Sequence, residues 1–249
     1  MLDRAAFLRP IAHRGLHNAS RGIVENTAPA FKAAIEKGYG IECDLRPADD
    51  GTPMVFHDLE LARLVDAPGR ITDHAPAALA RLTYRGNSER MVSFADFLDL
   101  VAGRAPLLVE VKSEWTSPDA AFLRAIAGHS TAYRGPLALM SFDPSIMAGL
   151  KALAPGVPRG IVAGLYEGPG WWQDRLDKER AFRLSHLLES GPAEPHFFSY
   201  HVKALPTPVT RFVREVLHMP LFTWTVRTMA ERAAATQWAD AITFEGFEP

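Results

Sequence analysis

Short apolar runs recur along the chain and alternate with longer stretches of helical character. Eight apolar or β-branched runs predict strands: Pro10–His13, Gly40–Leu45, Leu107–Lys112, Leu137–Phe142, Arg159–Leu165, Phe197–Val202, Leu221–Val226 and Ala241–Glu245. Between them lie predicted helices: Ala28–Lys37, Ser93–Ala102, Pro118–Gly128, Pro144–Ala154, Arg175–Leu188, Val209–Leu217 and Met229–Trp238. Strands that alternate with helices favour a parallel sheet, and eight such units in 249 residues match a closed (β/α)8 barrel.

One connection in this pattern is too long for a single helix and two turns. Between the second and third strands, Arg46 to Pro106 contains a further strand-like run, Pro53–His57, and a helical stretch near Pro76–Leu82. We therefore expect a single domain over residues 1–249, with a small insertion after the second strand at about residues 46–106.

The second predicted strand carries two acidic residues, Glu42 and Asp44, separated by Cys43. Because side chains alternate along a strand, both carboxylates point to one face and Cys43 packs on the other. Two neighbouring carboxylates repel each other and are costly to bury. The pair is therefore typical either of a site for a hard divalent cation or of a strand that exposes both acids to solvent.

Further charged residues fall at the same level of the predicted barrel. The third strand places Glu110 and Lys112 on one face, and the first strand ends at His13-Arg14. Three carboxylates, Glu42, Asp44 and Glu110, can supply oxygen ligands to one Mg²⁺ or Ca²⁺ ion, and Mn²⁺ also suits such ligands. A cation site beside Arg14 and Lys112 favours an anionic ligand, and phosphate fits best.

Two of the nine histidines stand out, and we interpret the other seven as structural. His13 ends the first strand, and His57 follows the extra strand and directly precedes Asp58. Two histidines beside a phosphate can act as general base and general acid, and Asp58 could orient His57.

Composition narrows the range of partners and locations. The net charge is −2 with no basic block, which argues against nucleic acid as a partner. A single cysteine excludes an internal disulfide. The N-terminus lacks the pattern of a signal peptide, and no apolar run approaches the length of a membrane span, so we expect a cytoplasmic protein.

Taken together, the motifs resemble the glycerophosphodiester phosphodiesterase family, within the phosphatidylinositol phospholipase C-like superfamily. The resemblance rests on motifs in matching order: His13-Arg14-Gly15, Glu25-Asn26-Thr27, Glu42-x-Asp44, Asp50-Gly51 with His57-Asp58, and Glu110-Val111-Lys112. Weaker matches follow at Ser141-Phe142-Asp143 and Trp224-Thr225-Val226. Each motif is short, but five in order make a specific pattern.

The resemblance implies a (β/α)8 barrel with an insertion after the second strand. It also implies a divalent ion on Glu42, Asp44 and Glu110, with His13 and His57 as the acid–base pair and Arg14 and Lys112 on the phosphate. The implied reaction hydrolyses a glycerophosphodiester, a small-molecule substrate, to sn-glycerol 3-phosphate and an alcohol.

Several positions depart from the family pattern or have a second interpretation. Arg227 and Glu245 stand where the family often has Asn and Asp. Arg227 could contact the anion or form an ion pair with Glu245, and we favour the ion pair. We interpret Asn26 and Thr27 as helix caps, and Glu25 as reaching back toward the first strand. Trp224 is a candidate to line the substrate site.

Adjacent tryptophans follow the fifth strand, at Trp171 and Trp172. They could form a hydrophobic lid, but packing on the helix layer is favoured.

Other functions share parts of this pattern. A phospholipase C-like enzyme or a lysophospholipase D would act on a lipid and make transient membrane contact. A non-catalytic barrel would bind phosphate or serve as a scaffold. Loss of His13, His57 or a metal ligand would favour it, and all are present. A zinc hydrolase would show a His-x-His motif, and none occurs.

Overall fold

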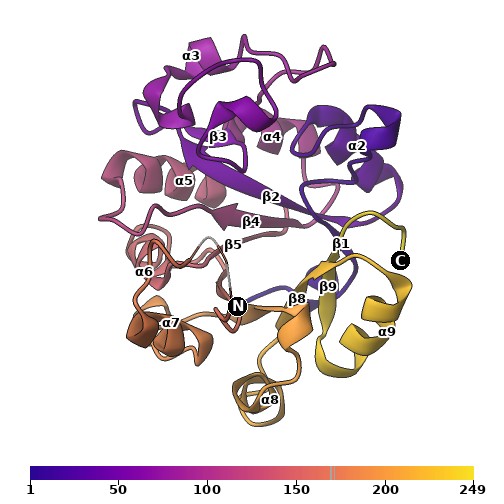
Figure 1. The fold of residues 1–249 in the computed structure, drawn as a ribbon, viewed down its shortest axis with the longest axis vertical. Helices are drawn as coiled ribbons and strands as arrows, with labels where there is room; N and C mark the ends of the chain where they lie inside the picture. Colours follow the sequence, from indigo (N-terminus) through magenta and orange to yellow (C-terminus); the bar gives the residue numbers. More distant parts are fainter. Residues whose placement is uncertain (169, 171) are drawn as a thin grey trace.

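A closed parallel barrel forms the centre of the computed structural model, which describes residues 1–168, 170 and 172–249. Its eight strands are β1 (Ile11–Ala12), β2 (Gly40–Pro47), β4 (Leu107–Val111), β5 (Leu137–Ser141), β6 (Arg159–Ala163), β7 (Phe197–His201), β8 (Leu221–Val226) and β9 (Ala241–Phe244). Each strand pairs in parallel with the next, and β1 pairs with both β2 and β9, which closes the barrel (Figure 1). The predicted (β/α)8 barrel is confirmed.

Helices surround the strands as an outer layer: α2 (Ala28–Glu36), α4 (Phe94–Val101), α5 (Ala120–Ala132), α6 (Pro144–Leu153), α7 (Lys178–Ser185), α8 (Pro208–Glu215) and α9 (Met229–Trp238). Their apolar faces pack on the outward side chains of the strands. Phe31 of α2 and Phe97 of α4 have ring centroids 4.5 Å apart in this layer. Cys43 is fully buried there, on the face of β2 away from the acids, as predicted.

The long connection between β2 and β4 adds a small lobe beside the barrel (Figure 1). It contains β3 (Pro53–Val55), which pairs antiparallel with β2, and the short helix α3 (Pro76–Leu79). A separate apolar cluster that includes Phe56, Leu61 and Tyr84 holds the lobe together. Because β3 pairs with the end of β2, the residues that follow it lie near the ends of the barrel strands.

The N-terminal end of the barrel is filled by apolar side chains. Helix α1 (Arg4–Phe7), which no sequence pattern predicted, places Phe7 against this end. Phe7 packs in one cluster with Leu108, Phe197 and Phe222. A Cβ at Gly160 would lie 2.3 Å from the Phe197 ring, so only glycine leaves room for that ring.

Among the described residues, no helix is long and apolar enough to cross a membrane.

The packing predicts that Leu108→Ala lowers the free energy of unfolding by about 2–5 kcal/mol, because the side chain is fully buried and leaves a cavity in the barrel. Chemical denaturation measures this loss. Leu188→Ala is the matched control, since Leu188 is 56% exposed, and we expect a change within about 0.5 kcal/mol there. Equal losses in the two variants would contradict this packing.

Candidate active site

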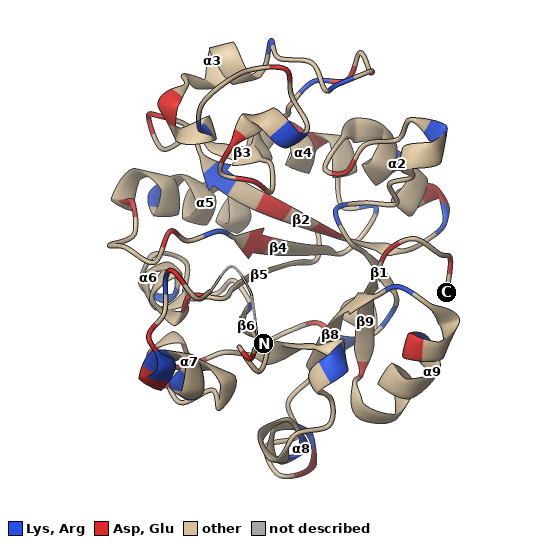
Figure 2. Ribbon diagram, in the orientation of Figure 1, with Lys and Arg blue, Asp and Glu red and all other residues tan. Residues whose placement is uncertain are grey.

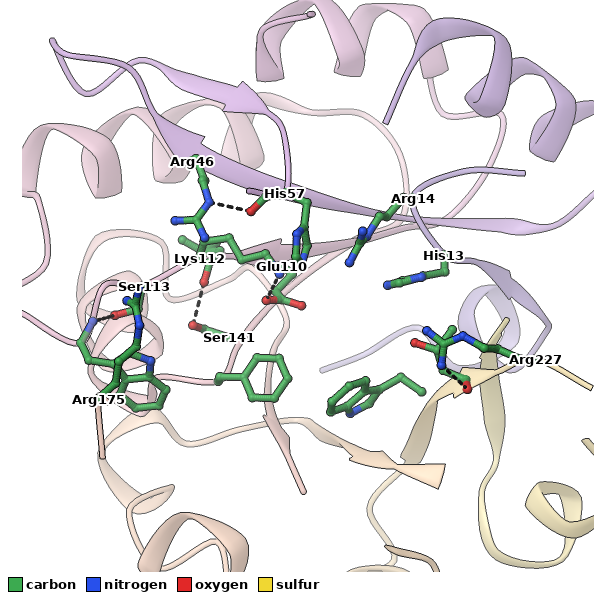
Figure 3. A pocket seen from close by; sticks show the side chains of 15 residues that line it. His13, Arg14, Arg46, His57, Glu110, Lys112, Ser113, Ser141, Arg175 and Arg227 are labelled. Atoms are coloured by element: carbon green, nitrogen blue, oxygen red, sulfur yellow. Dashed lines mark hydrogen bonds and ion pairs between the residues drawn. The ribbon is translucent and has the colours of Figure 1, made fainter. Parts of the chain in front are cut away.

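A cavity of about 360 Å³ opens at the C-terminal ends of the barrel strands. Six of the predicted site residues line it: His13, Arg14, His57, Glu110 and Lys112, which Figure 3 labels, and Trp224. Glu42 and Asp44 do not line it, since each is only 1% exposed. The structure therefore brings six predicted residues together around one opening, and the two buried acids lie next to Glu110, which lines it.

The strand register brings the three acids together. Asp44 on β2 is the direct neighbour of Glu110 on β4, and Glu42 lies two residues earlier on the same face of β2. Figure 2 shows acidic positions on these adjacent strands. One carboxylate oxygen from each residue lies within 4.8 Å of the others.

Two cations lie against this carboxylate cluster. The Lys112 ammonium is 2.8 Å from Asp44 Oδ1 and 2.6 Å from Glu110 Oε1. Arg14 Nε is 3.4 Å from Asp44 Oδ2, and the Arg14 backbone N–H donates to Glu42. Burial would raise the pKa of Asp44, but Lys112, His57 and Arg14 together hold it well below its usual value.

The negative charge of Glu42 is the least compensated of the three carboxylates. Its Oε1 atom is buried and accepts no hydrogen bond from any described residue. Burial, together with the charges of Asp44 and Glu110, raises the pKa of Glu42 well above its usual value. A buried carboxylate oxygen without a donor, beside two more acids, fits a divalent cation that prefers oxygen ligands.

Each cavity histidine is held by a carboxylate through Nδ1. His57 Nδ1 lies 2.7 Å from Asp58 Oδ1, and His13 Nδ1 lies 2.5 Å from Glu245 Oε2. An ionised carboxylate only accepts hydrogen bonds, so Nδ1 carries the proton in each ring and Nε2 is left to react. In Figure 3, Arg14 lies between these two rings.

A chain of alternating charges links the two sides of the cavity. Glu25 accepts from Arg14 at 2.7 Å and from Arg63 at 2.6 Å. Arg63, which belongs to the inserted lobe, also donates to Asp58, the partner of His57. Glu25 thus reaches back to Arg14, beside the end of the first strand, as predicted, and the lobe is tied to the barrel by ion pairs.

The prediction that Asn26 and Thr27 act only as helix caps is wrong. Thr27 occupies the N-cap position of α2, but its hydroxyl donates to the Val24 carbonyl instead of capping the helix. Asn26 is buried, and its side-chain amide donates to Asp44 Oδ2 at 2.9 Å. Asn26 therefore orients a carboxylate of the cluster, a contact that the local pattern did not reveal.

Comparison with known families agrees with this geometry. The profile of the glycerophosphoryl diester phosphodiesterase family matches residues 13–246. The chain belongs to this family. This match confirms the predicted family and the predicted enzyme class, a phosphoric diester hydrolase.

Individual relatives share only a moderate fraction of their residues with this chain. It is 28% identical over 170 residues to a glycerophosphodiester phosphodiesterase of Caldanaerobacter subterraneus subsp. tengcongensis, a match over 63% of this chain and 68% of the relative. It is 30% identical over 121 residues to glycerophosphodiester phosphodiesterase 1 of Mus musculus, over 48% of this chain but about a third (34%) of the mouse protein.

A solved structure shares the fold. A phosphodiesterase of Oleispira antarctica, in complex with the product sn-glycerol-3-phosphate, superposes with a TM-score of 0.73 at 21% identity. The alignment covers 96% of this chain and 94% of the other.

At the two positions that depart from the family pattern, the predicted ion pair is present. Arg227 Nε lies 2.6 Å from Glu245 Oε1. The contact between Glu245 and His13 was not predicted, because nothing local to either residue indicates it. Trp171 lies outside the described residues, and Trp172 is partly buried against Leu176 in an apolar cluster.

Because the Lys112 ammonium lies against Asp44 and Glu110, Lys112→Met should strongly lower the stability of the fold. The variant leaves three buried carboxylates with less compensation, so we expect the free energy of unfolding to fall by roughly 3–5 kcal/mol. Denaturation with and without Mg²⁺ should show that the ion recovers part of the loss. Lys37→Met is the control, because Lys37 pairs with Glu248 at the surface and its loss should not be measurable. A Lys112→Met protein as stable as wild type would refute the compensation described here.

Proposed function

We propose that the protein hydrolyses glycerophosphodiesters to sn-glycerol 3-phosphate and an alcohol, with one divalent cation. The observation that carries this proposal is the arrangement of two histidine–carboxylate pairs beside a buried cluster of three carboxylates. Family membership and the product complex of the Oleispira antarctica phosphodiesterase support it.

Glu42, Asp44 and Glu110 would hold the cation, and Mg²⁺, Ca²⁺ and Mn²⁺ all suit three carboxylates. When bound, such an ion supplies positive charge that polarises the phosphodiester and stabilises charge in the transition state. The unpartnered Glu42 Oε1 is the atom that most needs it. Asn26 holds one Asp44 oxygen in place from the other side.

The two histidines divide the proton transfers. One Nε2 accepts the proton of the attacking hydroxyl, from water or from the glycerol moiety itself, and the other donates a proton to the leaving alcohol. Glu245 and Asp58 keep the Nδ1 protons in place and orient the rings. Burial lowers the pKa of His13, an effect that the contact with Glu245 partly offsets, so His13 is neutral and able to accept a proton at neutral pH.

Positively charged side chains at the cavity bind the phosphate. Arg14 and Lys112 both line the opening and face the carboxylate cluster, so they offset the negative charge of an entering diester. Trp224 and Phe142 form an apolar wall, with ring centroids 5.2 Å apart. This wall also suits an acyl chain, which makes lysophospholipids the second substrate class that we consider.

The direct test is release of sn-glycerol 3-phosphate from glycerophosphocholine with Mg²⁺ or Ca²⁺, and again with excess chelator. We expect release that the chelator abolishes and that added metal restores. Folded protein that releases no product from glycerophosphocholine or from lysophosphatidylcholine, with Mg²⁺, Ca²⁺ or Mn²⁺, would refute the proposed activity.

Loss of either acid–base histidine should abolish most of the turnover. We predict that His57→Ala lowers kcat at least about a hundredfold, the usual scale for a missing general acid or base. His74→Ala is the control, because His74 lies in the same lobe but does not line the cavity, and its ring contacts the Pro68 carbonyl. Near-normal kcat in folded His57→Ala would remove His57 from the mechanism.

The pH dependence tests the pairing of His13 with Glu245. The carboxylate raises the pKa of His13 by hydrogen bonding and by its charge. Glu245→Gln removes both effects, so the limb of the kcat/KM profile that reports His13 should move to lower pH. Glu231→Gln should leave the profile unchanged, since Glu231 contacts Arg227 but not His13. An unshifted profile in Glu245→Gln would show that this contact does not control His13.

A further inference from the structure

A second group of metal-binding side chains lies beside the carboxylate cluster. It consists of His13 at the end of β1, His17 in the loop that follows, and Glu245 at the end of β9. One ligand atom from each residue lies within 4.8 Å of the others. The side chains are only 14%, 22% and 19% exposed, in that order, so the group is more than a set of surface residues.

The proposed reaction does not use His17, and the interaction of its ring with Glu245 is a long one. His17 Nε2 is buried and accepts or donates no hydrogen bond among the described residues. The nearest acidic atom, Glu245 Oε2, is 3.6 Å away. A buried ring nitrogen without a partner is costly, so a nitrogen that points at a carboxylate just beyond bonding distance indicates room for a ligand between them.

The donor set differs from that of the three carboxylates. Two imidazole nitrogens and one carboxylate oxygen are the ligands that Zn²⁺ prefers, whereas Mg²⁺ and Ca²⁺ prefer oxygen alone. Arg227 holds Glu245 Oε1 at 2.6 Å, which orients the carboxylate and leaves Oε2 toward the histidines. Such an outer contact is typical of metal-binding carboxylates.

Two of the three distances between ligand atoms approach those around a tetrahedral ion after a small movement, and the ring nitrogens of the two histidines lie within 4.8 Å of each other. Bonds of about 2.0–2.2 Å place two ligand atoms of tetrahedral Zn²⁺ roughly 3.4 Å apart. The 3.6 Å between His17 Nε2 and Glu245 Oε2 is already close to this spacing. The 2.5 Å between His13 Nδ1 and Glu245 Oε2 must open by about 0.9 Å, which rotation of the glutamate side chain can supply.

We propose that His13, His17 and Glu245 bind a Zn²⁺-like transition metal ion, and that the bound ion inhibits the enzyme. An ion on Nδ1 displaces the hydrogen bond to Glu245 and leaves the ring proton of His13 on Nε2. His13 can then no longer accept a proton there. Binding of the ion is independent of the proposed function, whereas the inhibition rests on it.

Calorimetric titration with Zn²⁺, in excess Mg²⁺ to fill the carboxylate cluster, tests the site without any activity. We expect wild type to bind one Zn²⁺ at this site and His17→Ala to bind it at least about tenfold more weakly, since even outer-shell losses cost this much. His17→Gln, which keeps a polar side chain, should behave in the same way. His74→Ala should match wild type. Equal Zn²⁺ affinity in wild type and both His17 variants would overturn the site.

Activity measurements test the inhibition separately. Zn²⁺ should inhibit wild type in excess Mg²⁺, whereas His17→Ala should keep its basal kcat and resist inhibition at the same Zn²⁺ concentration. If Zn²⁺ inhibits His17→Ala as strongly as wild type, inhibition through this site is overturned even if the site binds Zn²⁺. Failure of the proposed function would appear differently, as an enzyme inactive on every diester while Zn²⁺ still binds in the calorimeter.

Discussion

Mutual repulsion among three buried carboxylates is the constraint around which the site is organised. The register of β2 and β4 places Asp44 directly beside Glu110, and alternation along β2 adds Glu42 on the same face. Lys112 and Arg14 offset part of the negative charge, but one Glu42 oxygen stays without a donor among the described residues. The apolar interior of the barrel makes the remaining negative charge more costly, and a divalent ion would complete the balance.

The two ends of the barrel differ in composition and in role. Phe7, Leu108 and Phe197 fill the N-terminal end and contribute stability, whereas the charged residues gather at the C-terminal end. The inserted lobe supplies His57, and its Arg63 binds both Asp58 and Glu25. Through Glu25 this connection reaches Arg14, so the lobe and the barrel hold opposite sides of the cavity in one network of ion pairs.

The sequence predicted those features whose signals are local. Strand alternation in Gly40–Leu45 was sufficient to place Glu42 and Asp44 together, and the adjacency of His57 and Asp58 predicted their contact. The contact of His13 with Glu245 joins residues 232 positions apart, so no local pattern could reveal it. The same reason applies to the contact of His17 with Glu245, which forms only when β9 closes the barrel.

The most direct test of this account is the number of Mn²⁺ ions that the carboxylate cluster binds, measured by electron paramagnetic resonance of free Mn²⁺ in a titration. We expect one saturable ion per chain that competes with Mg²⁺. Asp44→Asn should lose that ion, because Asp44 neighbours Glu110 and contacts both Lys112 and Arg14. Folded wild-type protein that binds no Mn²⁺, or an Asp44→Asn variant that binds it equally well, would contradict the central claim.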